Sequence, residues 1–315
     1  MKAYFIQSDS RGTAIELREA AVPQAAAGQL LVKVRAASLN RGELIRGPVG
    51  INKPGPAKPM GSDGAGEIVA SGQRVMGRLP GAFAEYALMD AKDAIPVPAN
   101  LSWEEAAAVP ITFLVVYDML AQQGGLKAGE WLLVTGVSSG VGVAALLAAK
   151  AIGAKVVGTS GSSQKLSALK KLGLDVGIET RRPDFAEKVL EATGGKGANL
   201  VVNNVGGTVF AETIRALAFE GRHATVGYLD GTLKAELDIE TLHAKRLKLF
   251  GVSNKYRSAE QRSTTVEGFK RDWLPLFASG KLKPLIEQVF DFGQLPEAKK
   301  RMESDSHLGK LVVRI

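Results

Sequence analysis

Residues 131–142 read WLLVTGVSSGVG and decide the fold of this chain. The first five are apolar or β-branched and form a run short enough for a buried strand. The glycines that follow lead into a small-residue helix pattern over 141–153. A turn of this kind presents backbone N–H groups and a helix N-terminus to a phosphate, because glycine has no Cβ atom to block close approach. The stretch therefore predicts the pyrophosphate site of a dinucleotide-binding unit.

The sequence after this stretch alternates strand and helix patterns. KVVGT (155–159) and ANLVVNNVGG (198–207) indicate strands, and SQKLSALKKLG (163–173) indicates a helix after the first of them. Strands separated by helices of this length form a parallel sheet with crossover helices on its faces. We therefore expect a Rossmann-type, doubly wound α/β unit over residues 111–251.

The first third of the chain has the short alternating pattern of antiparallel strands. The prolines and glycines of GPVGINKPGPAKPMG (47–61) exclude a helix or a central strand there, so an ordered loop is expected. The C-terminal KLVVRI (310–315) is typical of a strand, which we expect to return to this β-rich region. The strand patterns are LVKVRAAS (31–38), GEIVAS (66–71) and AFAEYALM (82–89).

Composition excludes several kinds of site. The 315 residues include no cysteine, which removes disulfides, thiolate catalysis and cysteine-containing zinc sites. The histidines, His223, His243 and His307, lack metal-ligand spacing, so no metal is expected. No signal peptide and no apolar run of membrane-spanning length are found, which predicts a cytoplasmic protein without membrane contact. The net charge of +8 is dispersed along the sequence, which favours a solvated basic surface over a nucleic-acid interface.

The end of the second predicted strand indicates which dinucleotide is bound. An NAD site has an Asp or Glu about 20 residues past the glycines, where it binds the ribose hydroxyls. This chain has TSGSSQK (159–165) there, in which Ser160 and Lys165 can bind a 2′-phosphate. NADPH is therefore the expected cofactor. The alternative is that Ser162 or Ser163 only caps a helix and that Lys165 is a solvated surface residue.

The glycine pattern also opens short-chain dehydrogenases. That family places the motif near the N-terminus and takes its proton donor from a Tyr-x-x-x-Lys pair. Here more than a third of the chain precedes Thr135, and no tyrosine is followed four residues later by lysine. The short-chain family is therefore excluded.

Several short motifs follow one another along the whole chain. Each is weak alone, but their combined order is specific and resembles the medium-chain dehydrogenase/reductase superfamily, in its zinc-free, zeta-crystallin-like quinone oxidoreductase branch. The motifs are AASLNRGEL (36–44), GSDGAGEIVASG (61–72), GAFAEYALM (81–89), NNVGG (203–207), VGYLDG (226–231) and GKLVV (309–313).

The resemblance implies an α/β protein of two domains. A GroES-like β-rich catalytic domain would comprise residues 1–110 and 252–315, and a Rossmann cofactor domain would comprise 111–251, with the active site in the cleft between them. Zinc-dependent relatives carry Gly-His-Glu where this chain has Gly61-Ser62-Asp63. Zinc polarisation of the substrate is therefore not expected. A homodimer is also implied by the family.

The function implied is hydride transfer from NADPH to a small-molecule quinone or α,β-unsaturated carbonyl. Such acceptors are already polarised and leave negative charge on an oxygen that a hydrogen-bond donor can stabilise. Two alternatives stay open. One is a reductase of a specialised activated alkene, such as an enoyl thioester. The other is a non-catalytic, NADPH-linked nucleic-acid-binding protein, suggested by the positive net charge.

The resemblance also implies the site residues. Asn40 would face the nicotinamide and substrate, where its amide can donate to an oxyanion, although it could instead cap a helix. Tyr228 would line the nicotinamide as a proton donor or an aromatic wall. Arg181 follows Thr180, which stands where relatives have a tyrosine beside the adenosine phosphate. The expected cofactor-binding residues are Gly136, Ser139, Gly140, Val141, Gly142, Ser160, Gly161, Ser162, Lys165, Arg181, Asn204, Val205, Gly227, Tyr228, Ser253 and Asn254.

Overall fold

The computed structural model describes residues 1–9, 12–44, 55–253, 256–304 and 306–315. The chain forms two compact units, one from Met1–Ile111 with Val266–Ile315 (unit 1) and one from Thr112–Thr265 (unit 2). The second crossing between units falls inside a helix and not directly after residue 251, where the sequence places it. Most of the proline-rich loop predicted over 47–61 lies outside the described residues.

Unit 1 is built mainly of β-strands. Its elements are β1 (Lys2–Asp9), β2 (Gly12–Glu19), β3 (Gln29–Ser38), α1 (Arg41–Leu44), β4 (Lys58–Pro59), β5 (Asp63–Ile68), β6 (Arg74–Arg78), β7 (Tyr86–Asp90), β8 (Ile95–Pro96), α2 (Trp103–Ala107), α10 (Leu274–Ala278), β15 (Ile286–Asp291), α11 (Leu295–Glu303) and β16 (Lys310–Arg314). Helices α3 (Pro110–Tyr117) and α9 (Ala259–Asp272) each begin in one unit and end in the other.

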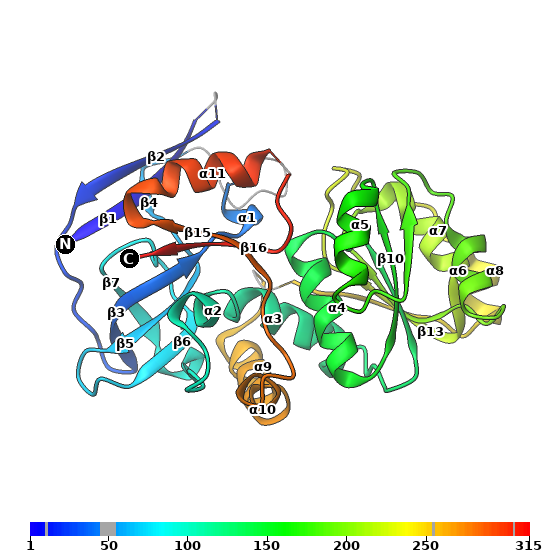
Figure 1. Ribbon diagram of the computed structural model, residues 1–315, viewed down its shortest axis with the longest axis horizontal. Coiled ribbons are helices and arrows are strands. Elements are labelled where there is room, and N and C mark those ends of the chain that lie inside the picture. The colour runs from blue at the N-terminus through cyan, green and yellow to red at the C-terminus, as the bar shows by residue number, and fades with distance from the viewer. Residues whose placement is uncertain (10–11, 45–54, 254–255, 305) are drawn as a thin grey trace. The chain divides into compact units, whose positions relative to one another are not determined.

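The larger sheet of unit 1 runs in the order β15-β16-β3-β5-β6-β8, and β7 also pairs with β3. The predicted C-terminal strand is confirmed as β16, which is antiparallel to β3. Helix α11 packs on β15 and β16 (Figure 1). Its Leu295, Ala298 and Met302 recur at helical spacing and are buried with Tyr4 and Leu311 in one apolar core. The β-rich region therefore closes only when the C-terminal strand joins it.

Unit 2 holds a parallel sheet with helices on both faces. Its elements are the π-helix η2 (Asp118–Gln122), β9 (Trp131–Thr135), α4 (Gly140–Ile152), β10 (Lys155–Ser160), α5 (Ser163–Lys170), β11 (Val176–Glu179), α6 (Ala186–Ala192), β12 (Ala198–Asn203), α7 (Phe210–Arg215), β13 (Leu217–Thr225), α8 (Ile239–Ala244) and β14 (Lys248–Gly251). The strand at 131–135 is confirmed at both ends, and the predicted helix at 141–153 is α4.

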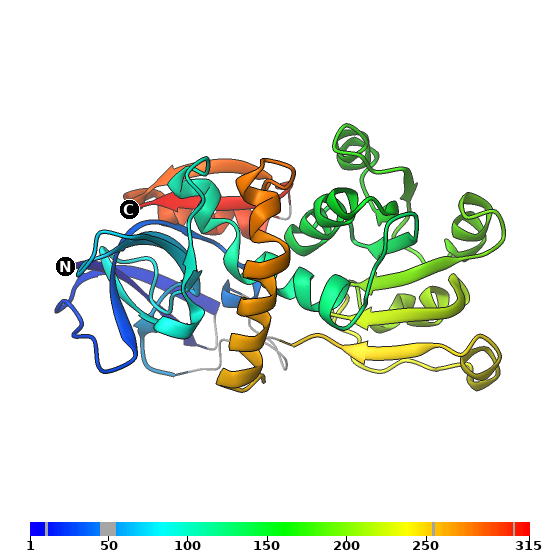
Figure 2. The ribbon, with the colours of Figure 1, turned by 90° about the horizontal axis from the view of Figure 1, so that it is seen from below.

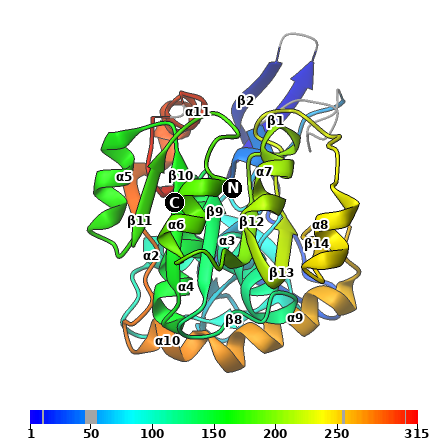
Figure 3. The same ribbon diagram turned by 90° about the vertical axis from the view of Figure 1, so that its right-hand side faces the viewer.

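The strand order of this sheet is β11-β10-β9-β12-β13-β14, the order of a doubly wound Rossmann sheet. Figure 2 shows these strands side by side, with the yellow β14 at the edge. Helices α4 and α5 cover one face and α6, α7 and α8 the other (Figure 1), so that α6 and α7 lie in front of the sheet in Figure 3. The predicted α/β class is confirmed. The order reverses between β9 and β12, which is where such sheets bind ligands.

Candidate functional site

The turn after β9 has a backbone that only glycine suits at two positions. Gly136 adopts a left-handed φ of +63°, and its N–H donates to Thr159 Oγ1 over 3.2 Å. A Cβ atom on Gly142 would lie 2.6 Å from the Gly136 carbonyl oxygen. Ser139 caps α4, its Oγ accepting from the Gly142 N–H over 3.1 Å. The close approach of turn and helix leaves a cradle of small residues at the N-terminus of α4, which fits a pyrophosphate.

Three further segments meet at the carboxyl ends of these strands. Asn204, which follows β12, donates from Nδ2 to the Thr135 carbonyl oxygen over 3.0 Å. A Cβ atom on Gly136 would lie 3.6 Å from Val205 and 3.8 Å from Asn204. One on Gly227, after β13, would lie 2.8 Å from the Asn204 carbonyl oxygen. The predicted residues of the glycine turn, the NNVGG motif and the VGYLDG motif are therefore neighbours. Tyr228 comes next and is 47% exposed.

The end of β10 carries the residues predicted to select the cofactor. Ser160 is buried, and its Oγ lies 3.1 Å from Ser138 Oγ, a serine of the glycine turn that the sequence did not single out. Ser162 caps α5 by accepting from the Lys165 N–H over 3.3 Å. The capping alternative for Ser162 is therefore what the structure shows.

Gly161 and Arg181 are in contact. A Cβ atom on Gly161 would lie 2.7 Å from Cγ and 2.8 Å from Cζ of Arg181, so the arginine side chain occupies the space that glycine leaves. The pairing of β10 with β11 causes this, because it sets Ser160 opposite Glu179, at the point where both strands end. Among the described residues, the exposed Arg181 has no hydrogen bond or ion pair. It is a cation beside the strand end where a dinucleotide places its ribose.

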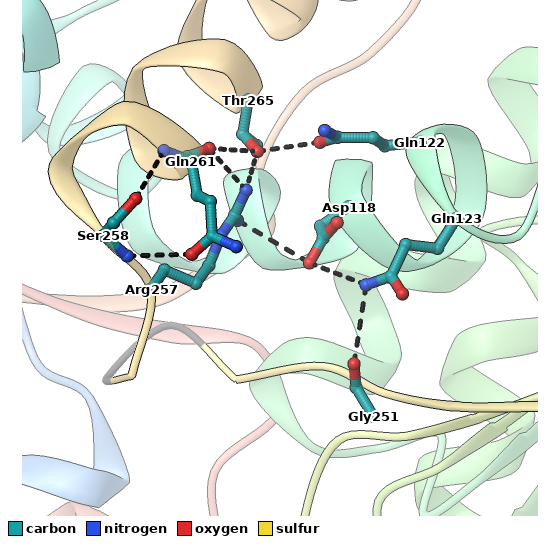
Figure 4. A network of polar contacts seen from close by, with 8 residues as sticks. All are labelled: Asp118, Gln122, Gln123, Gly251, Arg257, Ser258, Gln261 and Thr265. Carbon is teal, nitrogen blue, oxygen red and sulfur yellow. Dashed lines mark hydrogen bonds and ion pairs between the residues drawn. The ribbon is translucent and has the colours of Figure 1, made fainter.

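A polar network surrounds the segment that follows β14 (Figure 4). Gln123 Nε2 donates to the Gly251 carbonyl oxygen over 3.5 Å, and Arg257 forms an ion pair with the buried Asp118 at 3.6 Å. Arg257 also donates to Thr265, whose Oγ1 donates to Gln122 over 2.7 Å. The network ties both sides of Ser253 to the π-helix. π-Helical turns occur often at functional sites.

Ser253 is exposed, and Asn254 lies outside the described residues. Their predicted contact with the cofactor stays a prediction.

Unit 1 brings together the buried side chains of Asn40, Glu43, Asp63 and Lys310, which we call the Asn40 group. Asn40 Nδ2 donates to Glu43 Oε1 over 2.9 Å and to Asp63 Oδ1 over 2.8 Å. Lys310 Nζ donates to Asn40 Oδ1 over 2.8 Å. Both amide protons of Asn40 are therefore engaged with carboxyl groups. Its side chain bonds to these partners and is not a helix cap.

Strand order explains why these residues meet. β3 lies between β16 and β5 and is antiparallel to both. The C-terminal end of β3 therefore lies beside the N-terminal ends of its neighbours, where Asp63 begins β5 and Lys310 begins β16. Asn40 follows β3 by two residues. Each motif quoted from the sequence at these strand ends thus contributes one polar side chain to the same place.

Burial dominates the electrostatics of the Asn40 group. It raises the pKa of Glu43 to about 7, with the negative charge of Asp63 acting in the same direction. Burial also raises the pKa of Asp63 and lowers that of Lys310. Glu43, Asp63 and Lys310 were not predicted as site residues. The available signal was a charged residue inside otherwise apolar or small-residue motifs.

The part of the chain that the structure describes holds no cluster of three or more His, Asp or Glu residues that could bind a metal. Within the same residues, none of the helices combines the length and apolar character of a membrane span.

Comparison with known proteins gives consistent relatives. Residues 140–266 match the zinc-binding dehydrogenase family. The chain is 30% identical over 98% of its length to a phenolphthiocerol/phthiocerol polyketide synthase of Mycobacterium tuberculosis, of which it spans 14%. It is 31% identical over 75% of its length to the acryloyl-coenzyme A reductase of Sulfurisphaera tokodaii, of which it covers 66%.

Among solved structures, the quinone oxidoreductase of Thermus thermophilus, determined alone and with NADPH, superposes with a TM-score of 0.85 at 27% identity, with both chains fully covered. The two-unit fold and the glycine turn define an oxidoreductase with a Rossmann domain. The chain belongs to the medium-chain dehydrogenase/reductase superfamily, in its zinc-free quinone oxidoreductase branch.

Proposed function

We propose that the chain is an NADPH-dependent oxidoreductase that reduces a quinone or an α,β-unsaturated carbonyl. The observation that carries the proposal is the end of β10, where Ser160, Gly161 and Arg181 stand in place of the acid of an NAD site. The solved quinone oxidoreductase determined with NADPH supports it. When bound, the nicotinamide would supply the hydride.

The chain's own residues would bind the cofactor and stabilise the product oxygen. Backbone N–H groups of Gly140, Val141 and Gly142 would hold the pyrophosphate at the N-terminus of α4. Asn40 would donate to the developing oxyanion, which requires one of its two donated hydrogen bonds to be exchanged for the substrate oxygen. Tyr228 would line the nicotinamide as an aromatic wall or a proton donor.

A second candidate substrate is an enoyl thioester. The acryloyl-coenzyme A reductase relative favours it, because acryloyl-coenzyme A is an α,β-unsaturated carbonyl in thioester form. The chemistry required of the site is the same, and only the approach for the carrier differs.

A screen of NADPH oxidation against quinones, enals, enones, enoyl thioesters and simple alcohols tests both candidates. Turnover with a conjugated acceptor and none with saturated alcohols is expected. Turnover restricted to alcohols would contradict the proposal. A salt titration of RNA binding separates the non-catalytic alternative, since a phosphate interface loses affinity steeply as salt rises.

A further inference from the structure

The Asn40 group contains two carboxyl groups and one ammonium group, all removed from water. Asp63 is 0% exposed, Glu43 7% and Lys310 6%. With both carboxyl groups ionised the group would carry one uncompensated negative charge, which is costly in a buried place. A single proton on one carboxyl group makes the group neutral.

Hydrogen-bond donors decide which carboxyl group holds that proton. Asp63 accepts from Asn40 Nδ2, from Ser38 Oγ over 3.1 Å and from the Ile111 N–H over 3.2 Å. Donors of this kind stabilise the ionised form. Glu43 has Asn40 and the hydroxyl of Ser62 as its hydrogen-bond partners. Asp63 is therefore the ionised member, and the proton lies on Glu43.

The charges that act on Glu43 come from two neighbouring strands. They are Asp63 on β5, which favours the protonated form, and Lys310 on β16, which opposes it. Helix α1 also packs on α11, where Arg41 donates to the Met302 carbonyl oxygen over 3.2 Å. The pKa of Glu43, about 7, places its titration in the physiological range.

We propose that Glu43 stores the proton that completes reduction of the substrate and that Ser62, half-buried beside it, passes this proton out of the Asn40 group. The inference rests on the proposed function, because hydride addition to the β-carbon of an enone leaves an enolate that must gain one proton.

The step balances without a further reactant. The Ser62 O–H bond breaks as its proton goes to the enolate, and the Glu43 O–H bond breaks as its proton replaces it on Ser62. Glu43 is left as a carboxylate and regains a proton from water. Asn40 keeps its bond to Glu43 Oε1 when that carboxyl group is protonated on the other oxygen.

The first experiment measures the stored proton directly, on the protein without cofactor. Infrared difference spectra of wild type against Glu43→Gln, recorded across a pH titration, should show a protonated-carboxyl band that disappears as the pH rises through about 7. Glutamine keeps the oxygen that accepts from Asn40 but has no such band. Absence of this band from the wild-type spectrum would overturn the inference.

The second experiment follows turnover with an enone against pH. Wild-type kcat should fall as the pH rises through about 7, because only the protonated form delivers the proton. Glu43→Gln should be slower below that pH and should lose the inflection. Asp63→Asn should move the inflection to lower pH, because it removes the charge that raises the pKa of Glu43.

Ser62→Ala separates storage from delivery. It should slow turnover as Glu43→Gln does but keep the infrared band. Melting temperatures of all variants identify loss of folding. A Glu43→Gln enzyme with the wild-type pH profile would overturn the inference, whereas a wild-type enzyme that oxidises NADPH with no conjugated acceptor would overturn the proposed function and leave the infrared result standing.

Discussion

Adding one carbon atom at Gly161 should weaken NADPH binding without unfolding the protein. The new Cβ atom would lie 2.7 Å and 2.8 Å from carbon atoms of Arg181, inside the 3.0 Å that real Cβ atoms keep. Arg181 is exposed and flexible, so it can swing aside at little cost in stability. Its guanidinium would then leave the 2′-phosphate. Losing one charge-assisted hydrogen bond costs about 1.5–3 kcal/mol, or about 10- to 150-fold in affinity.

The assay is isothermal titration calorimetry of Gly161→Ala, Arg181→Met and the double variant with NADPH and NADH at low ionic strength. NADH affinity should not change in any variant, because NADH lacks the 2′-phosphate. The double variant should bind NADPH as Arg181→Met alone does, since both changes remove the same contact. Wild-type NADPH affinity in both single variants would refute the role of Arg181. A further loss in the double variant would mean that Gly161 itself approaches the nucleotide.

Three more outcomes follow from buried polar groups. Asn40→Asp adds a third carboxyl group to the Asn40 group and should lower both melting temperature and turnover, whereas a fully active variant would remove the oxyanion role. Arg257→Met should destabilise the protein by about 3–5 kcal/mol in urea unfolding, because Asp118 stays buried without its ion-pair partner, and Asp118→Asn in the same chain should recover part of the loss. His223 has its pKa lowered from 6.5 to about 4 by burial, so stability should be full above pH 6.5 and fall by about 3 kcal/mol as the pH decreases towards 4. A His223→Gln protein with the same decrease would contradict this assignment.

The nucleotide turn could be predicted because its determinants are local. Strand, glycines and helix all lie within residues 131–153, and each pattern indicates the same β–turn–α unit. The loss of the acid after β10 is equally local. The contact between Gly161 and Arg181 could not be predicted, because it depends on the register in which β10 pairs with β11.

The Asn40 group shows the same limit more strongly. Asn40 was singled out through a resemblance, but its partners come from β5 and β16, whose positions beside β3 no local pattern specifies. The sequence-based expectation of a free oxyanion donor did not include the two carboxyl groups that hold its amide. Charged residues at the start of short apolar strands are ordinary surface residues unless the sheet order places them together.

The bond between Lys310 and the Leu39 carbonyl oxygen joins residues 271 positions apart in the chain. A ribosome that synthesises this protein releases Glu43 and Asp63 long before the ammonium group that compensates them. Unit 2 is continuous in sequence and can collapse while the last strand is still being made. The nascent chain would therefore acquire a folded Rossmann sheet first, and β16 would complete the acid–base site as one of the final events of biosynthesis. Premature termination before residue 310 should leave a protein with a formed parallel sheet and an open, aggregation-prone edge at β3.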